Sequence, residues 1–394
     1  MGELGKYARA GALLALFLSG SAARAQWPWK DLDPGRHPVG YRVVRQYDRS
    51  RTFGDAVNGV ATDRLIEIRI WYPAASSVGT RMPYAGYRDA DGADGPIGPL
   101  SDTLKLRTER DIKLAGMRFG NDTVQLPARL FASTTGVVRN APIAAGPFPA
   151  IVAAPGRNDA SDDNAVLWEY LASHGYVVGL VASQGLNTVS VTQATGSTEA
   201  GVRDMEFALA HLLGMREVDG TRIGTAGFSL GGLWALVLAM RNARVRGVVG
   251  LDPAFIFERT SASLRASPLF DSTRFATPLL VFAQRDGEWA PEVIEALRAA
   301  PRFTIRIAGM DHTDFSSYGA ALRNHLGAAA REPAMRHRLN GFVAVATYVR
   351  DFLDAFVKGD EARALAIRSK PRWGGVKSED VDFSFRLGAP VVEQ

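Results

Sequence analysis

A serine flanked by glycines, at residues 227–232, is the feature that most restricts the fold of this chain. The stretch reads Gly-Phe-Ser-Leu-Gly-Gly, so Ser229 lies in a G-x-S-x-G pentapeptide. Residues 222–226 before it predict a short buried strand, and the apolar run 233–240 after it predicts a buried helix. Such a turn lets neighbouring backbone approach the glycines and lifts the serine hydroxyl to the rim of a sheet. The pattern therefore predicts a nucleophilic serine and hydrolase chemistry.

Strand and helix patterns alternate on both sides of this turn. Apolar runs predict strands, and periodic apolar residues predict helices that carry Val166 to Leu171 and Val202 to Leu212. The expected strands are 150–154, 176–182, 222–226, 245–251, 279–282 and 303–307, and a C-terminal helix is expected at 341–358. This order predicts an α/β fold with a mostly parallel central sheet and helices on both faces.

The segments outside this alternating part carry weaker signals. Residues 38–44 and 65–73 predict an N-terminal antiparallel hairpin, whose second strand places Ile66, Ile68 and Ile70 on one face. Residues 74–146 have little periodicity and are expected to form an irregular insertion. Residues 381–387 alternate with period two and predict an edge strand.

The first 25 residues are expected to be a signal peptide. Lys6 and Arg9 precede the apolar run 12–18, and small residues lead up to Ala25. The run is too short to span a bilayer, and no later stretch reaches the roughly 18 apolar residues that a transmembrane helix needs. We expect an exported protein, periplasmic or secreted, with residues 26–394 as a single domain and no transmembrane segment.

The amino-acid composition excludes several kinds of site and partner. The chain of 394 residues has 46% hydrophobic residues and no cysteine, which excludes disulfides, thiolate metal sites and a cysteine nucleophile. The net charge of +5 becomes about +3 without the leader, and the basic residues are scattered, so no nucleic-acid partner is expected. No metal-binding or cofactor motif is found, and Asp159, Asp162 and Asp163 are expected to cap the following helix. The sequence leaves the oligomeric state open.

A serine hydroxyl needs a base, and the base needs a carboxylate to orient it. His312 follows the expected strand 303–307 and is the candidate base. The other histidines have structural interpretations: His325 and His337 are expected at the surface, His174 at a helix end and His211 packed within a helix. Two carboxylates, Asp252 and Asp286, each follow an expected strand. Spacing alone does not separate them.

Several short segments occur in the order found in platelet-activating-factor acetylhydrolase-like esterases, which have the α/β-hydrolase fold. They are residues 38–40, 70–73, 141–143 with 148–149, 171–175, 227–232, 251–252 and 312–315. The resemblance covers most of the chain after the leader. It implies Asp252 as the acid, whereas related secreted polyester and lipid hydrolases use the later position, here Asp286.

The same resemblance implies an oxyanion hole. The N–H of Leu230, directly after the nucleophile, is one expected donor, and the N–H of Arg157, after Gly156, matches the second donor of the family. The chain departs from the family at Pro155 and Phe228, where histidines are usual, and residues 180–184 lack a common acidic motif. A preference for short-chain phospholipid acyl groups therefore does not follow, and the Pro155-Gly156 pair is closer to cutinase-like enzymes.

The expected function is an exported serine esterase that needs no cofactor. It would hydrolyse short-chain or lipid-like carboxylic esters through an acyl-enzyme on Ser229, as in lipid degradation. Two alternatives remain open at this point. One is a cutinase-like polyester hydrolase or an amidase with Asp286 as the acid, and the other is a non-catalytic binding protein with the same fold.

Overall fold

The computed structural model describes residues 29, 31–54, 62–88, 125–188, 190–192, 194–371, 373 and 375–389. The expected signal peptide, residues 1–25, lies outside these residues, as do residues 89–124 of the expected insertion. None of the helices in the described part of the chain combines the length and apolar character that crossing a membrane requires.

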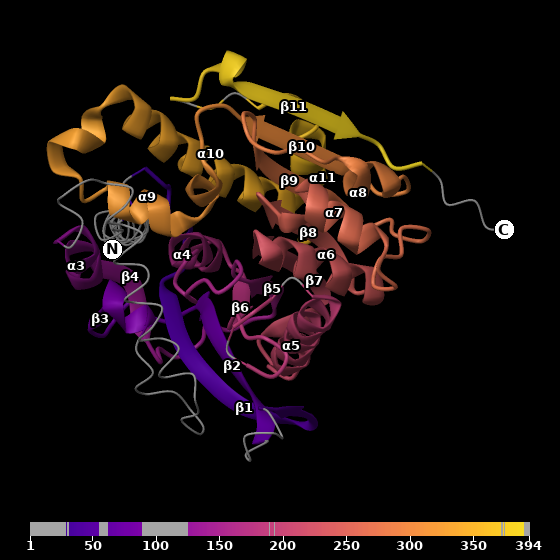
Figure 1. Cartoon of the computed structure of the whole chain (residues 1–394). Helices are drawn as coiled ribbons and strands as arrows, with labels where there is room; N and C mark the ends of the chain where they lie inside the picture. Colours follow the sequence, from indigo (N-terminus) through magenta and orange to yellow (C-terminus); the bar gives the residue numbers. More distant parts are fainter. Residues whose placement is uncertain are drawn as a thin grey trace, which may run out of the picture.

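Within the described residues, eleven strands form one sheet in the order β11-β10-β9-β8-β7-β5-β6-β2-β1-β4-β3. The strands are β1 (Val39–Phe53), β2 (Thr62–Pro73), β3 (Arg81–Pro83), β4 (Thr134–Arg139), β5 (Phe148–Ala154), β6 (Val177–Val181), β7 (Val218–Phe228), β8 (Val245–Leu251), β9 (Leu279–Gln284), β10 (Arg302–Ile307) and β11 (Val381–Arg386). Strands β5 to β10 are parallel to their neighbours within this group. Figure 1 shows the sheet running from β1 and β2 in indigo to β11 in yellow.

Helices cover both faces of the sheet. The α-helices are α3 (Gln125–Ala132), α4 (Ala165–Ser173), α5 (Thr195–Leu213), α6 (Leu230–Arg241), α7 (Glu258–Arg265), α8 (Glu292–Ala296), α9 (Ser317–Arg323), α10 (Pro333–Phe356) and α11 (Glu361–Ala366). Five short 3₁₀ helices within the described residues are η1 (Tyr84–Tyr87), η3 (Ala254–Ile256), η4 (His312–Phe315), η5 (Gly327–Arg331) and η6 (Ser378–Asp380).

The alternation of side chains along the central strands separates two apolar cores. On β5, Ile151 packs in a core with α4, α9 and α10, whereas Val152 packs in a core with α5, α6, α7 and α8. Both faces of the strand are apolar because both are buried, as is typical of a parallel sheet. These features confirm the expected α/β-hydrolase fold, with a mostly parallel sheet, helices on both faces and an N-terminal antiparallel hairpin.

The C-terminal edge of the sheet agrees with the sequence prediction, whereas residues 74–146 are more regular than predicted. The tail strand β11 pairs antiparallel with β10 at the edge, where the sequence predicted an edge strand. The expected irregular insertion is partly regular, because β3, η1, α3 and β4 fall within it and β4 pairs with β1. These elements are short, and their pairing partners lie far along the chain, so local periodicity did not indicate them.

The register of the central strands brings their carboxyl ends to one edge. Phe228 at the end of β7 is paired with Leu251 of β8, and Leu251 is paired with Phe282 of β9. The residues that follow these strands therefore leave the sheet at the same edge. In α/β folds this edge is where ligands bind.

Candidate active site

Ser229 lies in the strained turn between β7 and α6. Its backbone has φ 52° and ψ −118°, a left-handed conformation that is uncommon for a residue with a side chain. The Ser229 N–H donates to the carbonyl of Leu251 at 3.0 Å, and the Ser229 carbonyl accepts from the N–H of Ala254 at 2.7 Å. These two hydrogen bonds tie the turn to the end of β8 and to η3, and they stabilise the strained backbone of Ser229.

The glycines around Ser229 are required by close backbone contacts. A Cβ on Gly227 would lie 2.1 Å from the carbonyl carbon of Gly231, and a Cβ on Gly231 would lie 2.2 Å from the carbonyl oxygen of Ala154. The first turn of α6 thus lies against both β7 and the end of β5. This is the close approach that the glycine pattern predicted.

Asp252 and His312 form a hydrogen-bonded pair. The Nδ1 of His312 lies 2.5 Å from Oδ2 of Asp252, and the Asp252 side chain is 1% exposed whereas that of His312 is 33% exposed. Because an ionised carboxylate only accepts, Nδ1 is the donor and Nε2 is left for another partner. Asp252 has φ 42°, so the residue after β8, like the one after β7, has a left-handed backbone.

Gln284 at the end of β9 completes the surroundings of this carboxylate. Its backbone N–H donates to Oδ1 of Asp252 at 3.1 Å, and its side-chain Nε2 donates to Oδ2 at 2.8 Å. With His312, three donors therefore converge on the buried carboxylate of Asp252. Sequence reasoning missed Gln284, and the available signal was its position just after a predicted strand, 279–282, on the edge where the candidate acids were expected.

Two aromatic rings contact the His312 imidazole. The ring of Phe228 lies 4.6 Å from it, centroid to centroid, at an interplanar angle of 30°, and the ring of Phe257 lies 5.6 Å away at 67°. Phe228 is the chain neighbour of Ser229. The residue directly before the candidate nucleophile therefore packs against the imidazole of the candidate base.

Asp286 lies apart from this pair. Its side chain is 66% exposed, its Oδ1 is 3.7 Å from Nε of Arg285, and its Oδ2 accepts from the N–H of Gly309 at 3.1 Å. The structure brings Asp252, and not Asp286, to His312.

The two expected oxyanion donors lie on segments that touch. Gly231 in the first turn of α6 packs against the carbonyls of Ala154 and Pro155, which begin the loop that carries Arg157. Leu230 is buried and the Arg157 side chain is exposed. The next residue, Asn158, has φ 59° and fastens this loop to the loop after β6: its N–H donates to Oγ of Ser183 at 2.9 Å, and its Oδ1 accepts from the N–H of Val191 at 2.7 Å.

His174, His211, His325 and His337 are not paired with Asp252. His174 is the C-cap of α4, where its Nε2 lies 3.1 Å from the carbonyl of Asp33 and burial lowers its pKa to about 4. Burial also lowers the pKa values of His211, in the last turn of α5, and of His325. The surface positions expected for His325 and His337 are wrong in part, because both side chains are half-buried and Nε2 of His337 lies 2.7 Å from the carbonyl of Ala308.

None of the three acidic residues before α4 is its N-cap. Asn164 is the N-cap and makes no side-chain capping bond, so the N-cap position expected for one of the aspartates is wrong. Asp162 is instead fully buried and accepts from Nε of Arg88 at 2.9 Å. Among the described residues, no group of three or more His, Cys, Asp or Glu is arranged to hold a metal ion.

Comparisons with known proteins agree with this architecture. Residues 144–300, less than half of the chain, match the dienelactone hydrolase family. The structure is similar to a ferulic acid esterase from Streptomyces cinnamoneus, with a TM-score of 0.58 and 20% sequence identity over 88% of this chain and 96% of that chain. A search of curated proteins finds no match. The family match and the fold support a hydrolase.

Proposed function

We propose that this chain is an exported serine esterase that hydrolyses carboxylic esters through an acyl-enzyme on Ser229. The observation that carries the proposal is the pairing of His312 with the buried Asp252, beside the strained turn that presents Ser229. A buried acid, a partly exposed imidazole and a serine at the carboxyl edge of the sheet are the groups that acyl transfer needs. The departures from acetylhydrolases at Pro155 and Phe228 leave the acyl preference to experiment.

The reaction would proceed in two halves. Oγ of Ser229 attacks the ester carbonyl carbon while Nε2 of His312 takes its proton, and Asp252 stabilises the imidazolium through Nδ1. The backbone N–H groups of Arg157 and Leu230 would hold the resulting oxyanion. His312 then gives the proton to the departing alkoxide, and the alcohol leaves.

In the second half, water attacks the acyl carbon and Nε2 of His312 accepts a proton from it. The bond between the acyl carbon and Ser229 breaks, the serine oxygen regains the proton, and the carboxylic acid is released. No bound cofactor takes part in these steps.

A fluorophosphonate probe tests the nucleophile. We expect it to label the wild type and Ser263→Ala, in which an exposed serine of α7 is removed, but not Ser229→Ala. Ser229→Ala should also lose ester hydrolysis by several orders of magnitude, with an unchanged thermal unfolding temperature. A folded wild type that neither reacts with the probe nor hydrolyses any ester would leave the binding-protein alternative.

A substrate panel tests the ester class. It would contain p-nitrophenyl esters graded by acyl length, a ferulate ester, a lactone and a polyester film, the middle two because the comparisons point to a ferulic acid esterase and to dienelactone hydrolases. We expect the highest kcat/KM for a short-chain or lipid-like ester. A cutinase-like polyester hydrolase or an amidase using Asp286 is less well supported, because that carboxylate is exposed and engaged elsewhere.

A further inference from the structure

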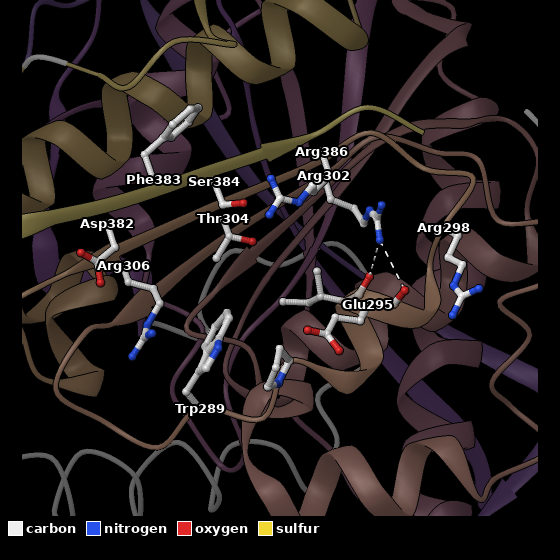
Figure 2. A pocket seen from close by; sticks show the side chains of 12 residues that line it. Trp289, Glu295, Arg298, Arg302, Thr304, Arg306, Asp382, Phe383, Ser384 and Arg386 are labelled. Atoms are coloured by element: carbon white, nitrogen blue, oxygen red, sulfur yellow. Dashed lines mark hydrogen bonds between the residues drawn. The ribbon is translucent and has the colours of Figure 1, made fainter. Parts of the chain in front are cut away.

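One face of the edge strands β10 and β11 borders a polar groove. Their antiparallel register pairs Arg302 with Arg386, Thr304 with Ser384 and Arg306 with Asp382. Alternate residues of a strand share a face, and the intervening residues Phe303, Ile305 and Ile307 of β10 are buried in the core. The three cross-strand pairs line a cavity of about 520 Å³, together with Trp289 and residues of α8 (Figure 2).

The groove carries a surplus of positive charge. Four arginines and two carboxylates line it, so its net charge is +2. The arginines are Arg298, Arg302, Arg306 and Arg386, and the carboxylates are Glu295 and Asp382. Arg306 is already engaged, because its guanidinium lies over the Trp289 ring at 4.7 Å and donates to the carbonyl of Arg285 at 2.6 Å. In the described part of the chain, no ion pair involves the other three arginines.

Arg302 is at the centre of this unbalanced charge. Its Nη1 donates to the carbonyls of Ile294 and Glu295 at 3.3 and 3.4 Å, as Figure 2 shows, while its buried Nε has no partner among the described residues. Its cross-strand partner Arg386 has the same charge, an arrangement that destabilises a sheet. Burial, followed by the charges of Arg386 and Arg298, lowers the pKa of Arg302.

Deprotonation does not relieve this repulsion, because a guanidinium stays charged at neutral pH. A bound anion does relieve it, and guanidinium groups match the paired oxygens of carboxylates and phosphates. The Thr304 and Ser384 hydroxyls lie between the basic end of the groove and the Arg306 end, where they can hydrogen-bond the body of a ligand.

We propose that this groove is a binding site for a dianionic oxyanion ligand, a phosphate monoester or a dicarboxylate, held by Arg298, Arg302 and Arg386. The charge of the ligand matches the surplus of the groove. The site is separate from Ser229, which follows β7, three strands from β10 in the sheet. It therefore does not depend on the proposed esterase activity.

Calorimetric titration of the full folded protein tests the site. The probes are inorganic phosphate and succinate at about pH 8, where phosphate is mostly dianionic, with the ionic strength held constant by sodium chloride. We expect saturable binding of at least one probe to the wild type and to Arg244→Gln, which removes an exposed arginine before β8. Binding to Arg386→Gln and to Arg298→Gln should be about tenfold weaker, because each loses a charge-assisted hydrogen bond.

Comparison of the two probes identifies the oxyanion: tighter phosphate binding assigns a phosphate monoester, and tighter succinate binding assigns a dicarboxylate. Arg386 and Arg298 are exposed, so neither variant should unfold at a lower temperature than the wild type without ligand, and Arg386→Gln, which removes the repulsion with Arg302, can unfold at a slightly higher one. The proposal is overturned if the folded wild type binds neither probe saturably. It is equally overturned if Arg386→Gln and Arg298→Gln bind as tightly as Arg244→Gln.

Discussion

Buried charge is used differently at the carboxyl edge of the parallel strands and in the N-terminal hairpin. At the edge, the buried Asp252 is paired with His312, whose side chain is one-third exposed. In the hairpin, Glu67 of β2 is paired with Arg45 at 2.8 Å and with Arg69 at 2.7 Å, and all three side chains are at most 2% exposed. Because a guanidinium keeps its charge at neutral pH, the hairpin cluster has a structural role, whereas the edge pair contains the imidazole that the proposed reaction uses.

The largest expected effect separates the two candidate acids. Asp252→Asn should lower kcat by about 10⁴-fold, because the amide no longer favours the reactive tautomer of His312. Asp286→Asn is the matched control and should change kcat little, since its carboxylate contacts Gly309 and Arg285. Steady-state kinetics on one good ester measures both. The opposite ranking would move the acid to Asp286.

Breaking the hairpin cluster should affect folding rather than chemistry. Glu67→Gln leaves Arg45 and Arg69 without a buried counter-charge, and we expect the free energy of unfolding to fall by about 3–5 kcal/mol. Although burial raises the pKa of Glu67, the charges of Arg69 and Arg45 hold that pKa below its ordinary value, so the native group is ionised.

Urea unfolding measures this loss. The matched control is Glu217→Gln, which removes a pair with the exposed Arg216 and should change the free energy of unfolding little. The kcat of the folded fraction of Glu67→Gln should equal that of the wild type. A variant that unfolds normally but loses kcat would contradict the division between the two regions.

A third buried carboxyl, Glu169 of α4, joins the N-terminal elements and should make stability depend on pH. It accepts hydrogen bonds from Tyr87, from Nε1 of Trp29 at 3.2 Å and from the N–H of Gly136 at 3.2 Å. Burial outweighs these donors and the more distant charge of Arg81 and raises the pKa of Glu169 to about 7 from 4.5.

The sign follows from proton linkage. Between about pH 4.5 and 7 the folded state holds a proton on Glu169 that the unfolded state has released, so stability falls as the pH rises through this window. The loss contributed by Glu169 is about 3 kcal/mol. Glu169→Gln mimics the protonated carboxyl, so its unfolding free energy should fall less across this window. If the wild type and the variant have parallel stability profiles, Glu169 is not the group that titrates.

The sequence predicted the pairing of His312 with one of two carboxylates, but it gave no sign of the hairpin cluster. Strands β5 to β10 and their helices have strong local patterns. Asp252 directly follows a predicted strand, and Ser229 and His312 lie three and five positions after the ends of two others. By contrast, Glu67 and Arg69 alternate in β2 with three isoleucines. This pattern identifies the apolar face of the strand, but it does not indicate which elements cover the polar face. They are buried partly under η1, whose Tyr87 carbonyl accepts from Arg69, and this contact lies within the segment that lacked periodicity. Local patterns cannot predict that a segment distant in sequence will pack over the polar face of a strand and bury it.

The smallest expected effect tests how firmly the edge pair is held. Gln284→Leu removes the Nε2 donor 2.8 Å from the Asp252 oxygen that also contacts His312, while the backbone N–H of Gln284 still donates to the other oxygen. Loss of one hydrogen bond to a charged group should lower kcat by about tenfold and leave KM nearly unchanged, if the side chain acts only by orienting the acid. The control Gln46→Leu lies at an exposed position of β1 and should leave kcat unchanged. An unchanged kcat in Gln284→Leu would mean that the backbone N–H and His312 suffice to hold Asp252, whereas a rise in KM alone would place Gln284 in substrate binding.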